Sequence, residues 1–135
     1  MISIGSHVVE WVAKQTNEFG NFGCAVGIGW EKDGELVAGV AYNEYNGKNM
    51  CTHIVIKNGQ MTKQFLRVIF DYPFNQANVH RITGLVGEGN IKSRRLCEKL
   101  GFIEETRLED CHPTGDLIIY RMRKQECKWL RMKNE

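Results

Sequence analysis

The sequence lacks the features that would place it in a membrane or an export pathway. Its longest apolar runs are only a few residues, whereas a membrane-spanning helix needs about 20. Residues 1–7 have neither the charged n-region nor the apolar h-region of a secretory signal. We therefore expect a cytoplasmic protein with no membrane partner.

Paired cysteines and a strong net charge are missing too. The five cysteines are an odd number and include no CxxC motif, which argues against a disulfide framework and a zinc site. We expect no metal, and reduced, mostly buried thiols, because a free cysteine behaves as a small hydrophobe. A formal net charge of +2 is too small to indicate nucleic acid by itself.

What is present indicates one globular domain over residues 1–135. The content of 42% hydrophobic and 25% charged residues is ordinary for a globular protein, and a chain of this length can bury most of its unfolded surface. No internal repeat, low-complexity tract or linker interrupts it.

The N-terminal half predicts a helix followed by three strands. These elements are expected over residues 6–19, 24–30, 35–42 and 50–56. Gly20-Asn21 should stop the helix, and Asp33-Gly34 should join the first two strands in a hairpin. Gly27 and Gly29 are unfavourable for the first strand.

The C-terminal half predicts alternating helices and strands. Helices are expected over residues 59–71 and 91–100, and strands over 81–86, 102–108 and 117–122. Pro73 should end the first helix or begin a new turn, since a proline inside a helix costs about 3 kcal/mol. Residues 110–114 should form a loop. The basic tail should pack Trp129 on the domain, with a membrane surface or an acidic partner as the less favoured alternative.

The segment Asn90–Phe102 has the most informative pattern, Asn-Ile-Lys-Ser-Arg-Arg-Leu-Cys-Glu-Lys-Leu-Gly-Phe. Asn90 is a good N-cap, the apolar residues fall on one helix face, and Gly101 supplies a left-handed C′ position. The preceding strand ends in Gly87-Glu88-Gly89. A helix N-terminus at the carboxyl end of a strand can offer backbone N–H groups to an anionic ligand.

This segment resembles the second signature segment of the GCN5-related N-acetyltransferases (GNATs), closest to the branch that acetylates ribosomal-protein N-termini. The likeness runs in register from about Thr52 to Met122. It implies the GNAT acyl-CoA N-acyltransferase fold, an α/β fold whose central, mostly antiparallel sheet has splayed middle strands flanked by helices. It also implies acetyl-CoA as cofactor, bound by about residues 52–122, and a primary amine of a protein N-terminus, lysine or small molecule as acceptor. Self-association into a homodimer is left open.

The resemblance also implies where the cofactor binds. The family's phosphate loop aligns with residues 56–62, in which only Gly59 and Thr62 match the family pattern. Gly59 would let the backbone approach phosphate, and nearby lysines would add charge. The residues expected in this part of the site are Val55, Ile56, Lys57, Gly59, Gln60, Met61 and Thr62. An N–H around Val55 would donate to the oxyanion.

On the signature helix, three positions are implied to face the cofactor. Asn90 should hydrogen-bond the pantetheine arm, and Ser93 should face the same ligand. Arg95, or Arg94 beside it, should reach the adenosine phosphates, because guanidinium groups suit bidentate phosphate contacts. The alternative for these arginines is a solvated helix face.

Acetyl transfer to an amine would benefit from a base, because α-amino groups titrate near ~8 and lysines near ~10.4. Glu88, at the end of its strand, and His53, within the third strand, are the two candidates; His80 and His112 are weaker ones. The alternative for Glu88 is a hydrated loop carboxylate without a catalytic role, and the alternative for His53 is a structural histidine. Many relatives carry a tyrosine where this chain has Cys97, whose thiol we expect only to pack.

Two alternatives to an enzyme stay open. The missing tyrosine and the degenerate phosphate loop favour a catalytically weak or inactive module that keeps the fold for CoA binding or protein interaction. Nucleic-acid binding has only scattered cations in its support, with no stacking pattern.

Overall fold

The computed structural model describes residues 1–16, 22–59 and 61–131. The strands are β1 (Ile2–Ile4), β2 (Val26–Lys32), β3 (Glu35–Asn43), β4 (Asn49–Ile56), β5 (Arg81–Gly87), β6 (Ile103–His112) and β7 (Gly115–Arg123). The helices are α1 (Ser6–Thr16), α2 (Lys63–Asp71) and α3 (Ile91–Leu100), with short helical turns at Tyr72–Gln76, Lys124–Glu126 and Lys128–Arg131. The stop predicted at Gly20-Asn21 lies outside the described residues.

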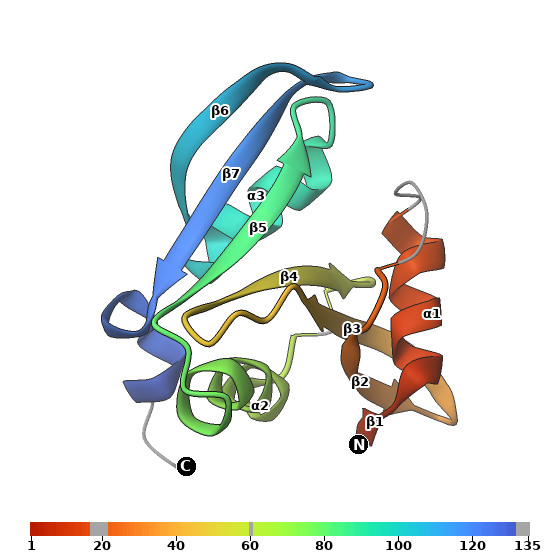
Figure 1. Cartoon of the computed structure of the whole chain (residues 1–135). Helices are drawn as coiled ribbons and strands as arrows, with labels where there is room; N and C mark the ends of the chain where they lie inside the picture. The colour runs from red at the N-terminus through yellow and green to blue at the C-terminus, as the bar shows by residue number, and fades with distance from the viewer. Residues whose placement is uncertain (17–21, 60, 132–135) are drawn as a thin grey trace.

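The strands form one sheet in the order β1-β2-β3-β4-β5-β7-β6. All neighbours pair antiparallel except β4 and β5, which run parallel. That parallel pairing covers only residues 49–51 with 81–83, and the two strands part beyond it (Figure 1). The expected mostly antiparallel sheet with splayed middle strands is therefore confirmed.

Several local predictions hold for clear physical reasons. Asp33 and Gly34 both take left-handed φ angles, of 54° and 79°, as a two-residue hairpin turn requires. A π-helical turn, Tyr72–Gln76, follows α2 directly and has Pro73 in its first turn. In the tail, the Trp129 indole donates to the Leu100 carbonyl at 2.8 Å and stacks near Phe70.

Several strand boundaries shift by one or two residues from the sequence prediction, and two differences are larger. β1 was not expected, because three residues are too short to give a periodic signal; it pairs with β2 at the sheet edge. β6 runs on to His112 where a loop was predicted over residues 110–114, and only 113–114 form a turn. Irregular pairing with β7 between Leu108 and His112 accommodates this extension.

The helix predicted from Gly59 begins instead at Lys63. Gly59 has a φ of +67°, which lies outside the right-handed helical region. The Thr62 hydroxyl accepts the N–H of Phe65 at 3.1 Å and so caps α2.

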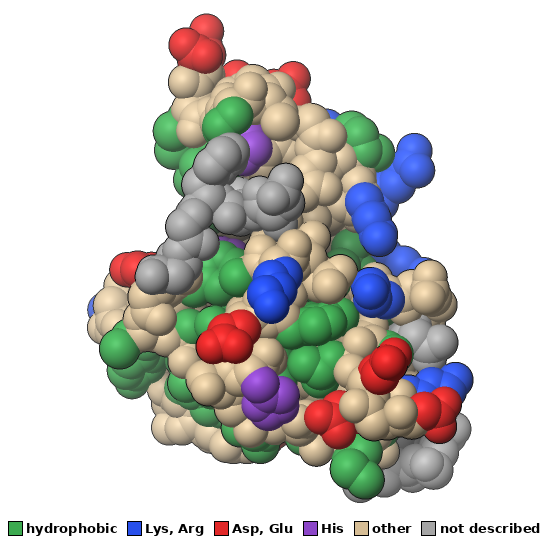
Figure 2. Space-filling model, turned by 90° about the vertical axis from the view of Figure 1, so that its right-hand side faces the viewer, with side chains coloured by type: hydrophobic (Ala, Val, Ile, Leu, Met, Phe, Trp, Pro, Cys, Tyr) green, Lys and Arg blue, Asp and Glu red, His purple; other side chains and the backbone are tan. Residues whose placement is uncertain are grey.

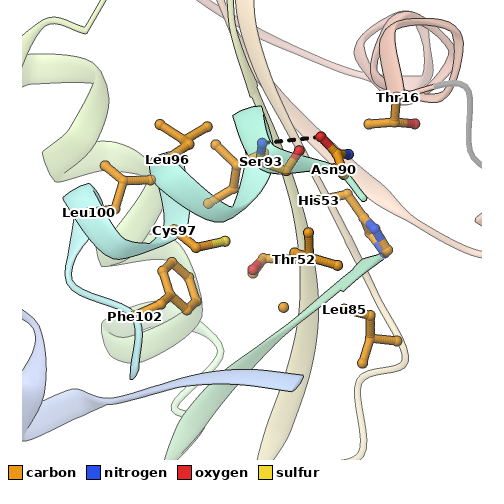
Figure 3. Close-up of a pocket in the computed structure, with 13 residues that line it drawn as sticks. Thr16, Thr52, His53, Leu85, Asn90, Ser93, Leu96, Cys97, Leu100 and Phe102 are labelled. Carbon is orange, nitrogen blue, oxygen red and sulfur yellow. Dashed lines mark hydrogen bonds between the residues drawn. The ribbon is translucent and has the colours of Figure 1, made fainter. Parts of the chain in front are cut away.

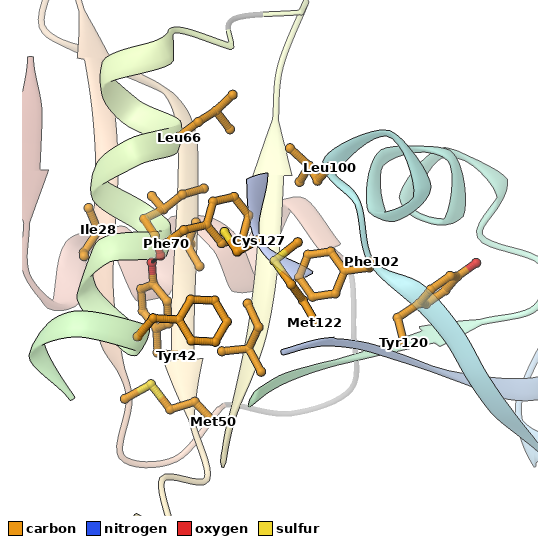
Figure 4. Close-up of a cluster of buried hydrophobic side chains, with 14 of the residues drawn as sticks. Ile28, Tyr42, Met50, Leu66, Phe70, Leu100, Phe102, Tyr120, Met122 and Cys127 are labelled. Atoms are coloured by element: carbon orange, nitrogen blue, oxygen red, sulfur yellow. Dashed lines mark hydrogen bonds between the residues drawn. The ribbon is translucent and has the colours of Figure 1, made fainter. Parts of the chain in front are cut away.

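The core lies on both faces of the sheet because the strands alternate. One cluster joins α2, with Phe70, to Phe102 and to inward-facing residues of β3, β5 and β7 such as Tyr42 and Met122 (Figure 4). A smaller cluster on the opposite face joins Val8 and Val12 of α1 to Ala41 and Val55.

The strand glycines that argued against β2 have a packing role. A Cβ on Gly27 would stand 2.7 Å from the Gly5 carbonyl oxygen and 2.9 Å from Cβ of Val8. A Cβ on Gly39 would lie 3.1 Å from Cγ2 of Val12. These glycines let α1 lie close to the sheet.

The cysteines are all free thiols, as expected, but not mostly buried: Cys24 and Cys111 are exposed.

Among the described helices, none is long and apolar enough to cross a bilayer.

Candidate active site

A cleft opens where β4 and β5 part, and the N-terminal turns of α3 form its other wall (Figure 3). It consists of two adjoining hollows. One extends toward β5 at Gly84–Val86, and the other follows β4 toward Ile56. The residues common to both are Thr16, Ile54, Asn90, Ser93 and Leu96.

The start of α3 has the predicted caps. The Asn90 side-chain oxygen accepts the N–H of Ser93 at 3.2 Å, and Gly101 closes the helix with a φ of 106°. This arrangement brings Asn90 and Ser93 to the cleft beside Ile54. The sequence predictions for these two side chains thus agree in position, while the cofactor contact itself stays a prediction.

The register of β4 identifies which of its backbone groups face the opening. The N–H of Lys57 donates to Val37 of β3 at 2.9 Å, and the β3–β4 pairing continues without a shift. The backbone N–H groups of successive residues point alternately to the two sides of a strand. The N–H of Val55, two residues before Lys57, therefore also faces β3. The oxyanion donor predicted at Val55 is therefore displaced by one residue: Ile54 and Ile56 carry the N–H groups that face the splay.

The loop before α2 is only partly as expected. Asn58 and Gly59 take left-handed φ angles of 51° and 67°. The Met61 N–H, predicted to face phosphate, donates instead to the Gly59 carbonyl at 2.7 Å, and Gln60 lies outside the described residues. The first turn of α2 begins at Lys63, where helical N–H groups have no partner within the helix.

Lys57 projects to the α1 face of the sheet, 5.9 Å from the centre of the Trp11 ring. On α3, Arg95 is exposed and Lys92 lines the cleft, whereas Arg94 turns back to donate to the Glu88 carbonyl at 3.1 Å. Arg95 is thus the better placed of the two arginines for an external phosphate. Figure 2 shows Lys and Arg side chains gathered toward one margin of the α1 face.

His53 is held at the cleft by two contacts. Its Nε2 lies 3.0 Å from Oδ1 of Asn43, and its ring stacks on Phe22 with 4.1 Å between centroids. Nδ2 of Asn43 in turn donates to the Phe22 carbonyl at 3.0 Å. Burial lowers the pKa of His53 from 6.5 to about 4, so the imidazole is neutral near pH 7.

Glu88, the other predicted base, does not line the cleft. Its carboxylate accepts the Asp116 N–H at 2.8 Å, and its own N–H donates to the Asp116 carbonyl at 2.9 Å. These bonds tie the end of β5 to the start of β7. The structure therefore brings His53, but not Glu88, to the place where β4 and β5 separate.

Cys97 faces the cleft from α3, and no tyrosine is among the described residues that line the cleft (Figure 3). Burial, together with nearby Glu98, raises the pKa of the Cys97 thiol to about 12, so it is protonated at neutral pH. Tyr120 packs on the far side of Gly84, but its hydroxyl donates to Glu98 at 3.4 Å and it does not line the cleft.

Asn43 and Phe22 were missed by the sequence reasoning. Asn43 stands where a strand meets a polar loop, and Phe22 follows the first helix; neither position carries a motif. The only signal for Asn43 was its place at the end of a strand paired with that of His53.

No protein-family model and no curated protein matches the chain, but solved structures do. A dodecameric spermidine N-acetyltransferase from Vibrio cholerae matches with a TM-score of 0.71 at 15% identity, over 93% of this chain and 94% of that one. A chimera of the Vibrio cholerae enzyme and hSSAT gives 0.64 at 20% identity, over 90% and 77%. A GNAT acetyltransferase from Bacillus anthracis gives 0.62 at 19%, over 82% and 71%. The chain has the GNAT fold.

Within the GNAT fold, this chain combines an open β4 edge, a capped α3 and a partly buried histidine at one cleft. The sequence had indicated the fold from the α3 segment and from the likeness that continues in register from about Thr52 to Met122. At identities of 15–20%, the similarity to these structures supports the fold alone. The activity and the acceptor have to be inferred from the residues of the cleft.

Proposed function

We propose that the protein is an acetyl-CoA-dependent N-acetyltransferase that transfers the acetyl group by direct attack of a primary amine in a ternary complex. The observation that carries this proposal is the unpaired edge of β4 beyond Cys51, facing the N-terminus of α3 across a cleft. A strand edge can hydrogen-bond an amide-bearing arm, and a helix start favours anionic groups.

The residues present fit acetyl-CoA. The N–H groups of Ile54 and Ile56 would hold the arm, with Asn90 and Ser93 opposite them. The loop at Gly59 and the first turn of α2 would hold the diphosphate, with Lys57, Thr62 and Arg95 around it. When bound, acetyl-CoA supplies an acetyl group activated as a thioester.

His53 is the group that we assign as proton acceptor. Its ring is neutral near pH 7 because burial lowers its pKa, and it lines the hollow between β4 and β5. It would accept the proton that the amine loses, directly or through water. Glu88 is committed to the backbone of β7, which disfavours the same role for that carboxylate.

For the acceptor, we propose a single amine such as a protein N-terminus, as in the ribosomal-protein branch that the α3 segment resembles. Two of the solved neighbours are named for spermidine, a polycation that carboxylates would recognise. No Asp or Glu is among the described residues that line the cleft. The side chains present there, such as His53 and Leu85, suit an uncharged body beside one amine.

Thiol release from acetyl-CoA with a panel of amines tests the proposal. The panel contains a peptide with a free α-amine, its N-formylated form with one lysine, and spermidine. We expect turnover with the α-amine peptide and a loss of about 10²-fold or more in kcat for His53→Ala, with acetyl-CoA affinity kept. Cys111→Ala, at an exposed site on β6, is the matched control.

The alternative, a CoA-binding module without activity, rests on the cysteine at position 97 in place of a tyrosine and on the degenerate phosphate loop. Calorimetry separates the cases. Heat on adding acetyl-CoA, with no release of the CoA thiol in the presence of any amine, favours the module. No heat at millimolar acetyl-CoA would reject both the enzyme and the module.

A further inference from the structure

The contacts around His53 distinguish its two ring nitrogens. The Asn43 amide is oriented by the backbone carbonyl of Phe22, which accepts from Nδ2 at 3.0 Å. If the amide were reversed, Oδ1 of Asn43 would face the carbonyl oxygen of Phe22 at that distance, and Nδ2 of Asn43 would face Nε2 of His53. Oδ1 of Asn43 therefore faces Nε2 of His53 at 3.0 Å, and an oxygen that only accepts requires the proton on Nε2.

The other nitrogen is left available. Nδ1 of His53 has no hydrogen-bond partner within the described part of the chain. It is also not one of the fully buried side-chain atoms that lack a partner, so this nitrogen is not fully buried. His53 itself lines the cleft between β4 and β5. A neutral imidazole with its proton on Nε2 carries its lone pair on Nδ1.

We propose that Asn43 is a positioning residue, which holds the proton of His53 on Nε2 so that Nδ1 is the atom that receives the proton of the acceptor amine. This inference rests on the proposed acetyltransferase function. In the step, the N–H bond of the amine breaks, a bond from Nδ1 to hydrogen forms, and the ring becomes an imidazolium that still donates from Nε2 to Asn43.

The choice of an amide rather than a carboxylate has a chemical consequence. Asn43 is neutral, and the groups that face His53 from its neighbours, Phe22 beside the ring and Leu85 across the hollow, carry no charge. Glu44 and Arg81 act on Cys51, two residues along β4, but burial accounts for the lowered pKa of His53. The imidazolium is therefore not stabilised by an ion pair, and His53 returns its proton readily.

Nitrogen-15 NMR of the whole labelled protein reads the tautomer without relying on activity. We expect the His53 signals at pH 7 to show a protonated Nε2 and an unprotonated Nδ1. Asn43→Asp, which keeps the shape and adds a charge, should raise the pKa of His53 by at least one unit. The signals of His7, His80 and His112 serve as internal controls in the same spectra.

Two further variants connect the tautomer to catalysis. Asn43→Ala should mix the tautomers and lower kcat about 10-fold or more, with KM for acetyl-CoA changed less than about twofold. Phe22→Leu removes the stacked ring but keeps the backbone carbonyl that orients Asn43, so the tautomer should be retained.

The possible outcomes separate this inference from the proposed function. A proton on Nδ1 in the native protein, or an unchanged kcat in a folded Asn43→Ala variant that otherwise transfers acetyl, would overturn the positioning role alone. If the protein shows the expected tautomer but acetylates no amine, the proposed function is refuted. The catalytic role of the contact between Asn43 and His53 is then refuted as well.

Discussion

His53 shows how a single side chain acquires its state from burial. The pKa of the ring falls from 6.5 to about 4 because the protonated form would lose solvation at the cleft. One neutral hydrogen bond to Asn43 does not offset that cost. The same burial that keeps the ring neutral for proton transfer also makes its protonation unfavourable to the fold.

This linkage predicts a loss of stability in acid that depends on His53. Between pH 6.5 and 4 the unfolded chain binds the histidine proton while the folded chain does not, so the free energy of unfolding falls as the pH falls. His53 should account for up to about 3 kcal/mol of this loss. Denaturant unfolding of wild type and His53→Gln at pH 7 and pH 4 measures it. Equal losses in both proteins would contradict the assignment.

Cys97 leads to a second prediction at the residue scale. Its thiol is protonated at neutral pH because its pKa is about 12, and only the thiolate is nucleophilic. Cys97→Ala should therefore keep acetyl transfer within about threefold of wild type, an expectation from packing alone. Steady-state kinetics measure this change. A loss of 100-fold in a folded variant, or an acetyl group found on Cys97 by mass spectrometry, would show that the thiol takes part.

At the scale of elements, the position of α1 depends on strand residues without side chains. Gly27 of β2 lies against Gly5 and Val8 at distances that no Cβ tolerates without movement. Gly84 of β5 offers a matched comparison, since a Cβ there would meet Tyr120 at 3.7 Å and Cys97 at 3.9 Å. Both glycines lie in strands and neither takes a left-handed φ.

We expect Gly27→Ala to lower the free energy of unfolding by about 1–3 kcal/mol, because α1 must shift away from the sheet. Gly84→Ala should change it by less than about 1 kcal/mol. Urea unfolding of both variants provides the comparison. The proposed close packing of α1 would be wrong if the two substitutions had the same effect.

At the scale of the whole molecule, the sheet consists of two parts that are joined at its centre by only three residue pairs between β4 and β5. Residues of both parts share the larger apolar cluster, which continues beneath the opening. The cleft is therefore a gap in hydrogen bonding that lies over a packed core. A ligand with amide groups could fill this gap as a strand would.

Binding of acetyl-CoA should protect specific amides across this gap. The N–H groups of Ile54 and Ile56 should exchange quickly in the free protein and slowly in the complex. The N–H of Val55, which the register pairs with Gly39 of β3, should be protected in both. Residue-resolved hydrogen exchange by NMR measures the three side by side. Protection of Val55 alone on binding would place the arm elsewhere.

The sequence by itself determined the features that depend on near neighbours. Asn90 caps α3 three residues ahead of Ser93, and Asp33-Gly34 turns the hairpin, because capping and turn chemistry act within a few residues. The fold itself was indicated by the resemblance of the segment Asn90–Phe102 to a GNAT signature, alongside these local signals. They did not separate Glu88 from His53 as the group at the cleft, because a loop carboxylate and a strand histidine look equally suitable in one dimension.

Only the tertiary structure decided how the cleft is built. Asn43 meets His53 across two strands, Phe22 reaches both from outside the sheet, and Glu88 binds the backbone at Asp116, 28 residues further on. The displacement from Val55 to Ile54 and Ile56 follows from strand register, in which a change of one residue reverses the direction of every N–H. Contacts between distant residues depend on how the strands pair and pack, and no local pattern in the sequence encodes that pairing.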